Sequence, residues 1–325
     1  MKKVVALLFG ILFALGIVSG CSQPPAKETS SQQLPAQPLK IGVLPIEDNL
    51  PLFLADSEKR FALAGLDVKL VPFPSAAERD AAMQAGQIDG EAADIVAASL
   101  LKKGGTDVRI TAITLGVTPQ EGRFVLLGSP NSNFKSARDL AGVKIAISEN
   151  TIIEYITDML LTNQGLKGDQ IQKLNIPKMP IRLQMLVGNQ VQAALLPDPL
   201  ATLAEKQGAR VIIDDTKSST NVSQVVLLFR QESIDSKKAP IKKLIEVYGQ
   251  AAKDLTENPA KYRALLVEKA KIPAPIKDTY KSPSFSKPQV PTEQEVMNVV
   301  NWMVAQKLLE RPYQYTELVD ASMLP

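Results

Sequence analysis

Histidine is absent from the 325-residue sequence, and cysteine occurs once, at Cys21. Without histidine the chain cannot build Ser–His or Cys–His nucleophile pairs, histidine zinc sites or the usual proton shuttle at neutral pH. With one cysteine it can form neither an intramolecular disulfide nor a cysteine metal cluster. Carboxylate or lysine chemistry stays open, but we predict no catalytic residue, no metal site and no cofactor.

Aromatic residues and excess charge are also scarce. Aromatic side chains make up 5% of the sequence, with one tryptophan, Trp302, and the formal net charge of +3 falls to +1 without Lys2 and Lys3. The basic residues are scattered rather than gathered in a stripe, so we predict no binding to nucleic acid. The length allows two domains that each bury a core.

The N-terminus has the layout of a secretory signal. Two lysines precede an apolar run over residues 4–18, and small residues lead to Cys21. This run is too short for a typical spanning helix. The Val-Ser-Gly-Cys ending resembles the lipobox of bacterial lipoproteins, in which the cysteine is lipidated, although an ordinary signal with a coincidental cysteine is the alternative. We expect a signal peptide over 1–20, a lipid anchor at Cys21 and a location on the extracytoplasmic face of the cell membrane.

Residues 21–38 are rich in proline and poor in bulky apolar residues, which predicts a disordered tether. Beyond it, short apolar runs alternate with helical segments, a pattern typical of parallel α/β sheets. After a returning strand at 222–229 the pattern becomes mostly helical. The expected strands are 39–44, 67–73, 109–115, 123–128, 143–147, 171–176, 191–196 and 209–213, and the expected helices are 51–63, 94–103, 151–163, 180–187, 199–207, 240–255, 259–270 and 295–309.

Six stretches carry a resemblance to a known family: LKIGVLP, FALAGLDVKLVPF, AGQIDG, DLAGVKIAIS, VGNQVQAALLPDPLATLAEKQGARVIIDD and PTEQEVMNVVNWMVAQKLL. Their order and spacing resemble the SsuA/THI5-like, or NMT1-like, solute-binding proteins. The resemblance implies a periplasmic-binding-protein type II fold, in which two α/β lobes are joined by a two-strand hinge. Lobe 1 would be discontinuous, 39–114 plus 225–325, lobe 2 would be 117–221, and the crossings would lie near 113–117 and 220–224.

The resemblance also implies a function in which no covalent bond is made or broken. Such a chain captures a small-molecule ligand as a monomer and delivers it to the permease and ATPase subunits of an ABC importer, while its lipid anchor holds it at the membrane. A tethered sensory or scaffolding lipoprotein with the same fold is the alternative. A pyrimidine-synthase-like enzyme is a weaker one, because those enzymes depend on histidine and a pyridoxal cofactor.

Ligands of open α/β sheets sit beyond the carboxyl ends of the strands, so the loops at those ends are the candidate site. Helix N-termini among these loops offer free N–H groups to an anion. The candidate ligand-binding residues are Glu47, Asp48, Asn49, Ser75, Glu91 and Asp94 in the first lobe, Thr118 in the hinge, and Ser148, Asn150, Thr151 and Asp198 in the second.

Carboxylates dominate these loops, which hold no lysine or arginine unless Arg79 or Arg123 turns inward. This composition favours an amine-bearing or neutral solute, such as a thiamine-type pyrimidine, over a sulfonate or nitrate. A purely structural role is the alternative for each group. Asp48 and Asp94 would then cap helices, as would Ser75 and Ser148, and Glu91 would point to solvent.

Overall fold

The computed structural model describes residues 38–218 and 220–325. The predicted signal peptide, the lipidation site Cys21 and all but the last residue of the predicted tether lie outside these residues. Among the helices of the part that is described, none combines the length and the apolar content that a membrane crossing requires.

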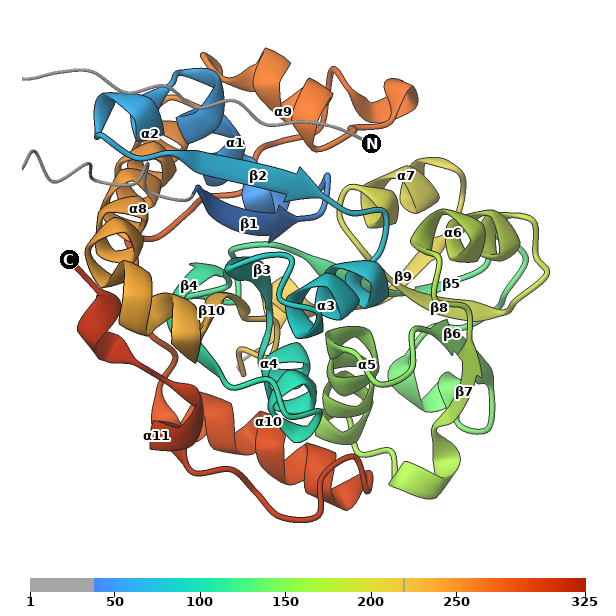
Figure 1. The fold of residues 1–325 in the computed structure, drawn as a ribbon. Coiled ribbons are helices and arrows are strands. Elements are labelled where there is room, and N and C mark those ends of the chain that lie inside the picture. Colours follow the sequence, from blue (N-terminus) through green and yellow to red (C-terminus); the bar gives the residue numbers. More distant parts are fainter. Residues whose placement is uncertain (1–37, 219) are drawn as a thin grey trace, which may run out of the picture. The chain divides into compact units, whose positions relative to one another are not determined.

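The first sheet has five strands in the order β2-β1-β3-β10-β4 (Figure 1). β1 runs parallel to β2 and β3, whereas β10 runs antiparallel to β3 and β4. The last strand therefore returns from far along the sequence to the interior of the first sheet. The bounds are β1 Leu39–Val43, β2 Val68–Pro72, β3 Gly90–Asp94, β4 Val108–Leu115 and β10 Val225–Arg230.

The second sheet also has five strands, in the order β7-β6-β8-β5-β9. β6 is parallel to β7 and β8, and β5 is antiparallel to β8 and β9. The expectation of purely parallel sheets is thus wrong at β5 and β10, because each enters its sheet from the other lobe and not through a helical crossover. The bounds are β5 Phe124–Gly128, β6 Lys144–Ile147, β7 Gln172–Asn175, β8 Ala193–Pro197 and β9 Arg210–Asp214.

Helices follow most strands, as the sequence predicts, with two differences. The helix expected over 51–63 is split at Lys59, which adopts a left-handed φ of 55°, and α8 begins before its expected start and is broken at Lys237. The α-helices are α1 Leu50–Ser57, α2 Arg60–Leu63, α3 Ala76–Gln84, α4 Ile95–Lys103, α5 Ile152–Asn163, α6 Met179–Val187, α7 Leu200–Lys206, α8 Gln231–Glu257, α9 Arg263–Lys269, α10 Glu293–Ala305 and α11 Tyr315–Leu318. The 3₁₀ helices are η1 Glu47–Asn49, η2 Ala137–Leu140, η3 Gly168–Gln170, η4 Asp215–Lys217, η5 Ala274–Ile276 and η6 Ala321–Met323.

Two chain segments connect the sheets, one between β4 and β5 and one between η4 and β10. They are tied together, since Asn221 Nδ2 donates a hydrogen bond of 2.6 Å to the carbonyl of Gly116. Glu121 braces the first segment by accepting from the backbone N–H of Gly116 at 3.2 Å and of Val117 at 3.0 Å. This arrangement is the two-strand hinge of the expected fold. The exact lobe boundaries stay a prediction.

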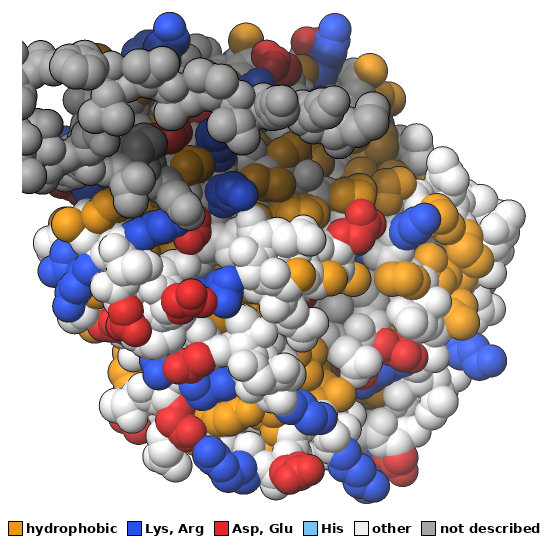
Figure 2. Space-filling view, in the orientation of Figure 1, with side chains coloured by type: hydrophobic (Ala, Val, Ile, Leu, Met, Phe, Trp, Pro, Cys, Tyr) orange, Lys and Arg blue, Asp and Glu red, His pale blue; other side chains and the backbone are white. Residues whose placement is uncertain are grey.

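Apolar side chains fill both faces of the first sheet. Leu227 and Phe229 of β10 belong to one buried cluster and Val226 and Leu228 to the other, because side chains alternate along a strand. Each cluster also includes residues of both lobes, so the lobes are in contact. On the face shown in Figure 2, acidic and basic side chains are interspersed.

Candidate functional site

The loop after β1 places Glu47, Asp48 and Asn49 in η1. Glu47 is 3% exposed, and its Oε2 accepts a hydrogen bond from the hydroxyl of Tyr280. Burial raises the pKa of Glu47 well above its usual range, which the bond from Tyr280 only partly opposes. Glu47 is therefore a carboxyl group held in an apolar setting rather than a solvated one.

The two residues beside Glu47 are also withdrawn from solvent. Asp48 is partly buried, and burial raises its pKa to about 6. Asn49 is buried, and its Oδ1 has no hydrogen-bond partner among the residues that the structure describes. The alternative in which Asp48 caps a helix is wrong, since the N-caps of η1 and α1 are Ile46 and Asn49. Asn49 thus offers an acceptor that no described residue uses.

Two other first-lobe residues serve as helix caps. Ser75 accepts a hydrogen bond of 3.3 Å from the backbone N–H of Glu78 at the start of α3. Asp94 accepts one of 2.9 Å from the backbone N–H of Ala97 at the start of α4, and burial raises its pKa to about 6. The alternative in which Ser75 and Asp94 cap helices is thus confirmed. A ligand role for either one stays a prediction.

Glu91 lies inside the first lobe and does not point to solvent. It is fully buried on β3, and its Oε2 is 3.5 Å from Nε of Arg79 on α3. Arg79 also contacts Asp80 at 2.7 Å and donates a bond of 2.6 Å to the carbonyl of Ala92. Burial raises the pKa of Glu91 to about 8 despite this cation. The alternative in which Glu91 faces solvent is therefore wrong.

The loop after β6 gathers the three second-lobe candidates, Ser148, Asn150 and Thr151. Thr151 caps α5 by accepting from the N–H of Ile153 at 3.2 Å, and its hydroxyl donates to the carbonyl of Ser148 at 2.7 Å. Asn150 is exposed, has a left-handed φ of 60°, and donates its backbone N–H to Glu154 at 2.6 Å. Ser148 is not the cap of α5, so the alternative in which it only caps this helix is wrong.

Arg182 is the cation that sequence reasoning missed. It lies in the first turns of α6, its side chain is fully buried, and its Nη1 donates a hydrogen bond of 3.2 Å to Oγ of Ser148. Its Nε and Nη2 have no partner among the described residues, and no carboxylate stands beside it. Burial lowers its pKa to about 10. The loops beyond the strands of the second lobe are therefore not purely acidic.

Asp198 is the second-lobe carboxyl group among the predicted site residues. Asp198, after β8, accepts from the backbone N–H of Thr202 at 2.9 Å and from its hydroxyl at 2.8 Å. Burial raises the pKa of both Glu47 and Tyr280, and the nearby carboxylate of Asp198 raises both further. The carboxylate of Asp198 therefore lies near enough to influence Glu47 and Tyr280 electrostatically, and a shared ligand role for Glu47 and Asp198 stays a prediction.

Of the remaining predicted features, Thr118 lies outside this cluster and Arg123 lies beside Asp198. Thr118 is exposed in the segment between β4 and β5, where its carbonyl accepts from the N–H of Glu121 at 3.0 Å. Nη1 of Arg123 is 3.8 Å from Oδ2 of Asp198, and Arg123 also contacts Asp214 at 2.8 Å and Glu205 at 2.7 Å, so its charge is already paired with carboxylates.

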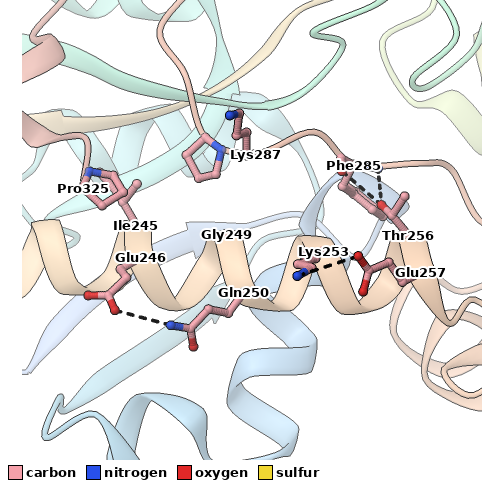
Figure 3. Close-up of a pocket in the computed structure, with 11 residues that line it drawn as sticks. Ile245, Glu246, Gly249, Gln250, Lys253, Thr256, Glu257, Phe285, Lys287 and Pro325 are labelled. Carbon is pink, nitrogen blue, oxygen red and sulfur yellow. Dashed lines mark hydrogen bonds and ion pairs between the residues drawn. The ribbon is translucent and has the colours of Figure 1, made fainter.

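A separate groove of about 370 Å³ runs along α8 (Figure 3). Phe285, Lys287 and Pro288 form its other wall, and its polar side chains largely pair with one another along the helix, as Gln250 does with Glu246 at 3.4 Å. None of the predicted site residues lines it. The groove therefore gives no support to a ligand site away from the loops described above.

Comparison with known proteins agrees with this architecture. Residues 32–268 match the model of the NMT1-like family, and the chain belongs to that family. A protein of Brachyspira hyodysenteriae named as an ABC transporter periplasmic binding protein is 22% identical over 276 residues, which cover 80% of this chain and 76% of that one. The family predicted from sequence motifs is confirmed.

Solved structures show the same fold at low identity. The ligand-binding component of an ABC-type import system from Staphylococcus aureus, with zinc bound, has a TM-score of 0.72 at 17% identity and covers 88% of this chain and 97% of its own. The aliphatic sulphonate binding protein SsuA from Escherichia coli has a TM-score of 0.71 at 21% identity, covering 87% and 91%. The periplasmic-binding-protein fold is therefore confirmed.

The fold is not confined to binding proteins. The desulfurization enzyme DszB has a TM-score of 0.66 at 13% identity, with 87% of this chain and 97% of the enzyme covered. The fold alone therefore does not decide between binding and catalysis, and the choice depends on the residues of the site.

Proposed function

We propose that this chain is the extracytoplasmic solute-binding lipoprotein of an ABC importer, and that it is not an enzyme. It captures a small polar organic solute between its lobes and delivers it to a permease driven by an ATPase. The observation that carries this proposal is that a chain of the NMT1-like family folds into two lobes joined by a hinge, whose two segments are tied by the bond of 2.6 Å from Asn221 to the carbonyl of Gly116. A ligand that contacts both lobes only when they are together shifts the population toward the closed form.

The absence of histidine and the character of the clustered groups support capture rather than catalysis. Glu47 and Asp198 both have raised pKa values because they are buried. Neither has a neighbouring serine, cysteine or lysine nucleophile among its hydrogen-bond partners in the described residues. We propose that these carboxyl groups accept hydrogen bonds from an amine or amide of the solute.

Arg182 supports a second feature of the solute. A buried guanidinium without a counter-ion is costly, typically by several kcal/mol, so an anion is expected to complete the site. We propose that an acidic group of the solute binds at Ser148 and Arg182 when the lobes separate to admit it. The solute would then carry both an amine and an acidic group, which joins the amine-bearing and sulfonate-type classes that the sequence left open.

Three probes with the same two-carbon chain test this ligand chemistry. Taurine carries an amine and a sulfonate, ethanesulfonate only the acid, and ethylamine only the amine. Thermal unfolding should show the largest stabilisation with taurine, since a bound ligand stabilises by RT ln(1 + [L]/Kd). Arg182→Met should remove the effect of ethanesulfonate and leave that of ethylamine. Equal shifts for all three probes would contradict this assignment of groups.

Transport itself needs a separate test, because a sensory or scaffolding lipoprotein would share the same fold. Native mass spectrometry of the protein purified from its host should reveal a co-purified small molecule. Deletion of the gene should then abolish uptake of that molecule by cells. Retained uptake would favour the sensory function, and a protein that carries no small molecule and responds to no metabolite panel would refute capture.

A further inference from the structure

Trp302 lies at a second meeting point of the lobes, on α10. Its indole is 8% exposed, and Nε1–H donates a hydrogen bond of 2.9 Å to Oδ2 of Asp158 on α5. Tyr155, also on α5, packs edge-on against the indole with ring centroids 5.3 Å apart. α10 belongs to the C-terminal part that packs with the first sheet, and α5 to the second lobe, so these contacts join the two lobes (Figure 1).

Asp158 is the centre of this contact. Besides Trp302, its Oδ2 accepts from Nε2 of Gln306 at 3.3 Å and lies 2.7 Å from Nζ of Lys173. Lys173 also contacts Glu154 at 2.7 Å. One buried carboxylate oxygen therefore receives two donors from one lobe and an ammonium from the other. Hydrogen bonds to ionised groups are about twice as strong as neutral ones, so this contact is a strong one.

One side of the contact packs into a buried apolar cluster that includes Tyr155 and Trp302, and the other side borders an open groove. A groove of about 630 Å³ runs between α5 and α10 and is lined by Glu154, Asp158, Lys173, Asn298, Trp302 and Gln306. Because solvent reaches this groove, the lobes can separate here without creating a large empty cavity. The bonds at Asp158 therefore add a directional component to the apolar packing of Trp302 and Tyr155.

We propose that Asp158, Lys173 and Trp302 form an interlobe latch that stabilises the closed arrangement and so raises ligand affinity without touching the ligand. The inference rests on the proposed two-lobe capture. The apparent dissociation constant equals the intrinsic one divided by the fraction of closed molecules. Loss of the latch therefore weakens binding by the same factor by which it reduces that fraction.

Tryptophan fluorescence and small-angle X-ray scattering of the full chain test the latch with no ligand added. Trp302 is the single tryptophan, so all tryptophan emission reports on this contact. Asp158→Leu should shift the emission to longer wavelength, increase quenching by acrylamide and increase the radius of gyration. Asp158→Asn keeps an acceptor oxygen for the indole and should restore both readouts at least in part. Circular dichroism checks that each variant is folded.

Two lysine variants provide the matched comparison. The side chain of Lys173 is 17% exposed and that of Lys102 is 16% exposed. Each pairs within its own lobe, Lys173 with the latch residue Asp158 at 2.7 Å and Lys102 with Asp107, away from the latch, at 2.5 Å. Lys173→Met should change emission and radius of gyration, and Lys102→Met should change neither. An unchanged radius of gyration in both Lys173→Met and Asp158→Leu would overturn the latch even if the emission moved. Failure of the proposed ligand would appear separately, in the thermal shifts described above.

Discussion

Asp215 holds a carboxyl group inside the segment that returns from the second sheet to the first. It is 2% exposed, and its Oδ1 accepts a hydrogen bond of 2.8 Å from the backbone N–H of Phe124. Burial raises its pKa to about 7, although this backbone bond acts in the opposite direction. In the unfolded chain an aspartate titrates near pH 4. Between these two pH values, folded Asp215 therefore keeps a proton that the unfolded chain has released.

This difference predicts a specific pH dependence. Between about pH 4 and about pH 7 the folded chain binds more protons than the unfolded one, so the free energy of unfolding falls as pH rises through this window. The Asp215→Asn variant has no carboxyl group to titrate at this position. Its free energy of unfolding should therefore fall over the same window by about 1–3 kcal/mol less than that of the unsubstituted chain. Urea unfolding at pH 5 and pH 8 measures the difference. Parallel pH profiles would show that Asp215 does not titrate there.

Single residues differ in how far the sequence reveals their role. Ser75 and Asp94 could be recognised as caps, because a cap and its helix are adjacent in the chain. Arg182 could not be recognised as part of the site, because its contact, Ser148, is 34 residues away. Its burial depends on the packing of α6 against β8 and α7, which no local pattern records.

At the scale of elements, α10 depends on its first turn. Thr292 accepts from the backbone N–H of Glu295 at 3.3 Å, and Glu295 accepts from that of Thr292 at 2.8 Å, which forms a capping box. The second carboxylate oxygen of Glu295 accepts a hydrogen bond of 2.8 Å from Gln224. The capping box therefore also attaches α10 to the residue that precedes β10.

Thr292→Ala should lower the free energy of unfolding by about 1 kcal/mol, since loss of an N-cap leaves backbone donors unpaired. Urea unfolding measures the change. Gln294→Ala is the control, because Gln294 lies exposed in the same turn and bonds only Asn298 in the described part of the chain, at 2.7 Å. Equal losses in both variants would contradict a capping role for Thr292.

Most elements could be predicted because strand and helix periodicities are local. The orientation of β5 and β10 could not, since an antiparallel strand has the same alternation of side chains as a parallel one. In α8, the sequence predicts a helix start at Pro240. The backbone close to this position leaves the helical conformation at Lys237. Proline is tolerated in the first turn of a helix, which explains why α8 resumes directly before it.

At the scale of the whole molecule, the two lobes and their hinge could be predicted only through family resemblance. Composition and periodicity indicate two α/β units, but they do not show that residues beyond 225 return to the first one. The contact between Asp158 and Trp302 spans 144 residues and is likewise invisible in local sequence.

The remaining proposal about the whole molecule is that a lipid on Cys21 anchors it to the membrane, and a substitution at Cys21 tests this proposal. Cys21→Ser should prevent lipidation and move the protein from the membrane fraction to the soluble extracytoplasmic fraction. Fractionation of cells labelled with an alkyne fatty acid measures both effects at once. A variant that remains in the membrane fraction would show that another feature anchors the chain.

The position of β10 has a consequence for how the chain folds. In the first sheet β4 pairs with β10 and with no other strand of the described residues, and β10 follows β4 by more than a hundred residues. An emerging chain can complete the second sheet while the apolar β4 still lacks its partner. We therefore expect the first sheet to be completed last, so that β4 is exposed to aggregation during synthesis until β10 emerges.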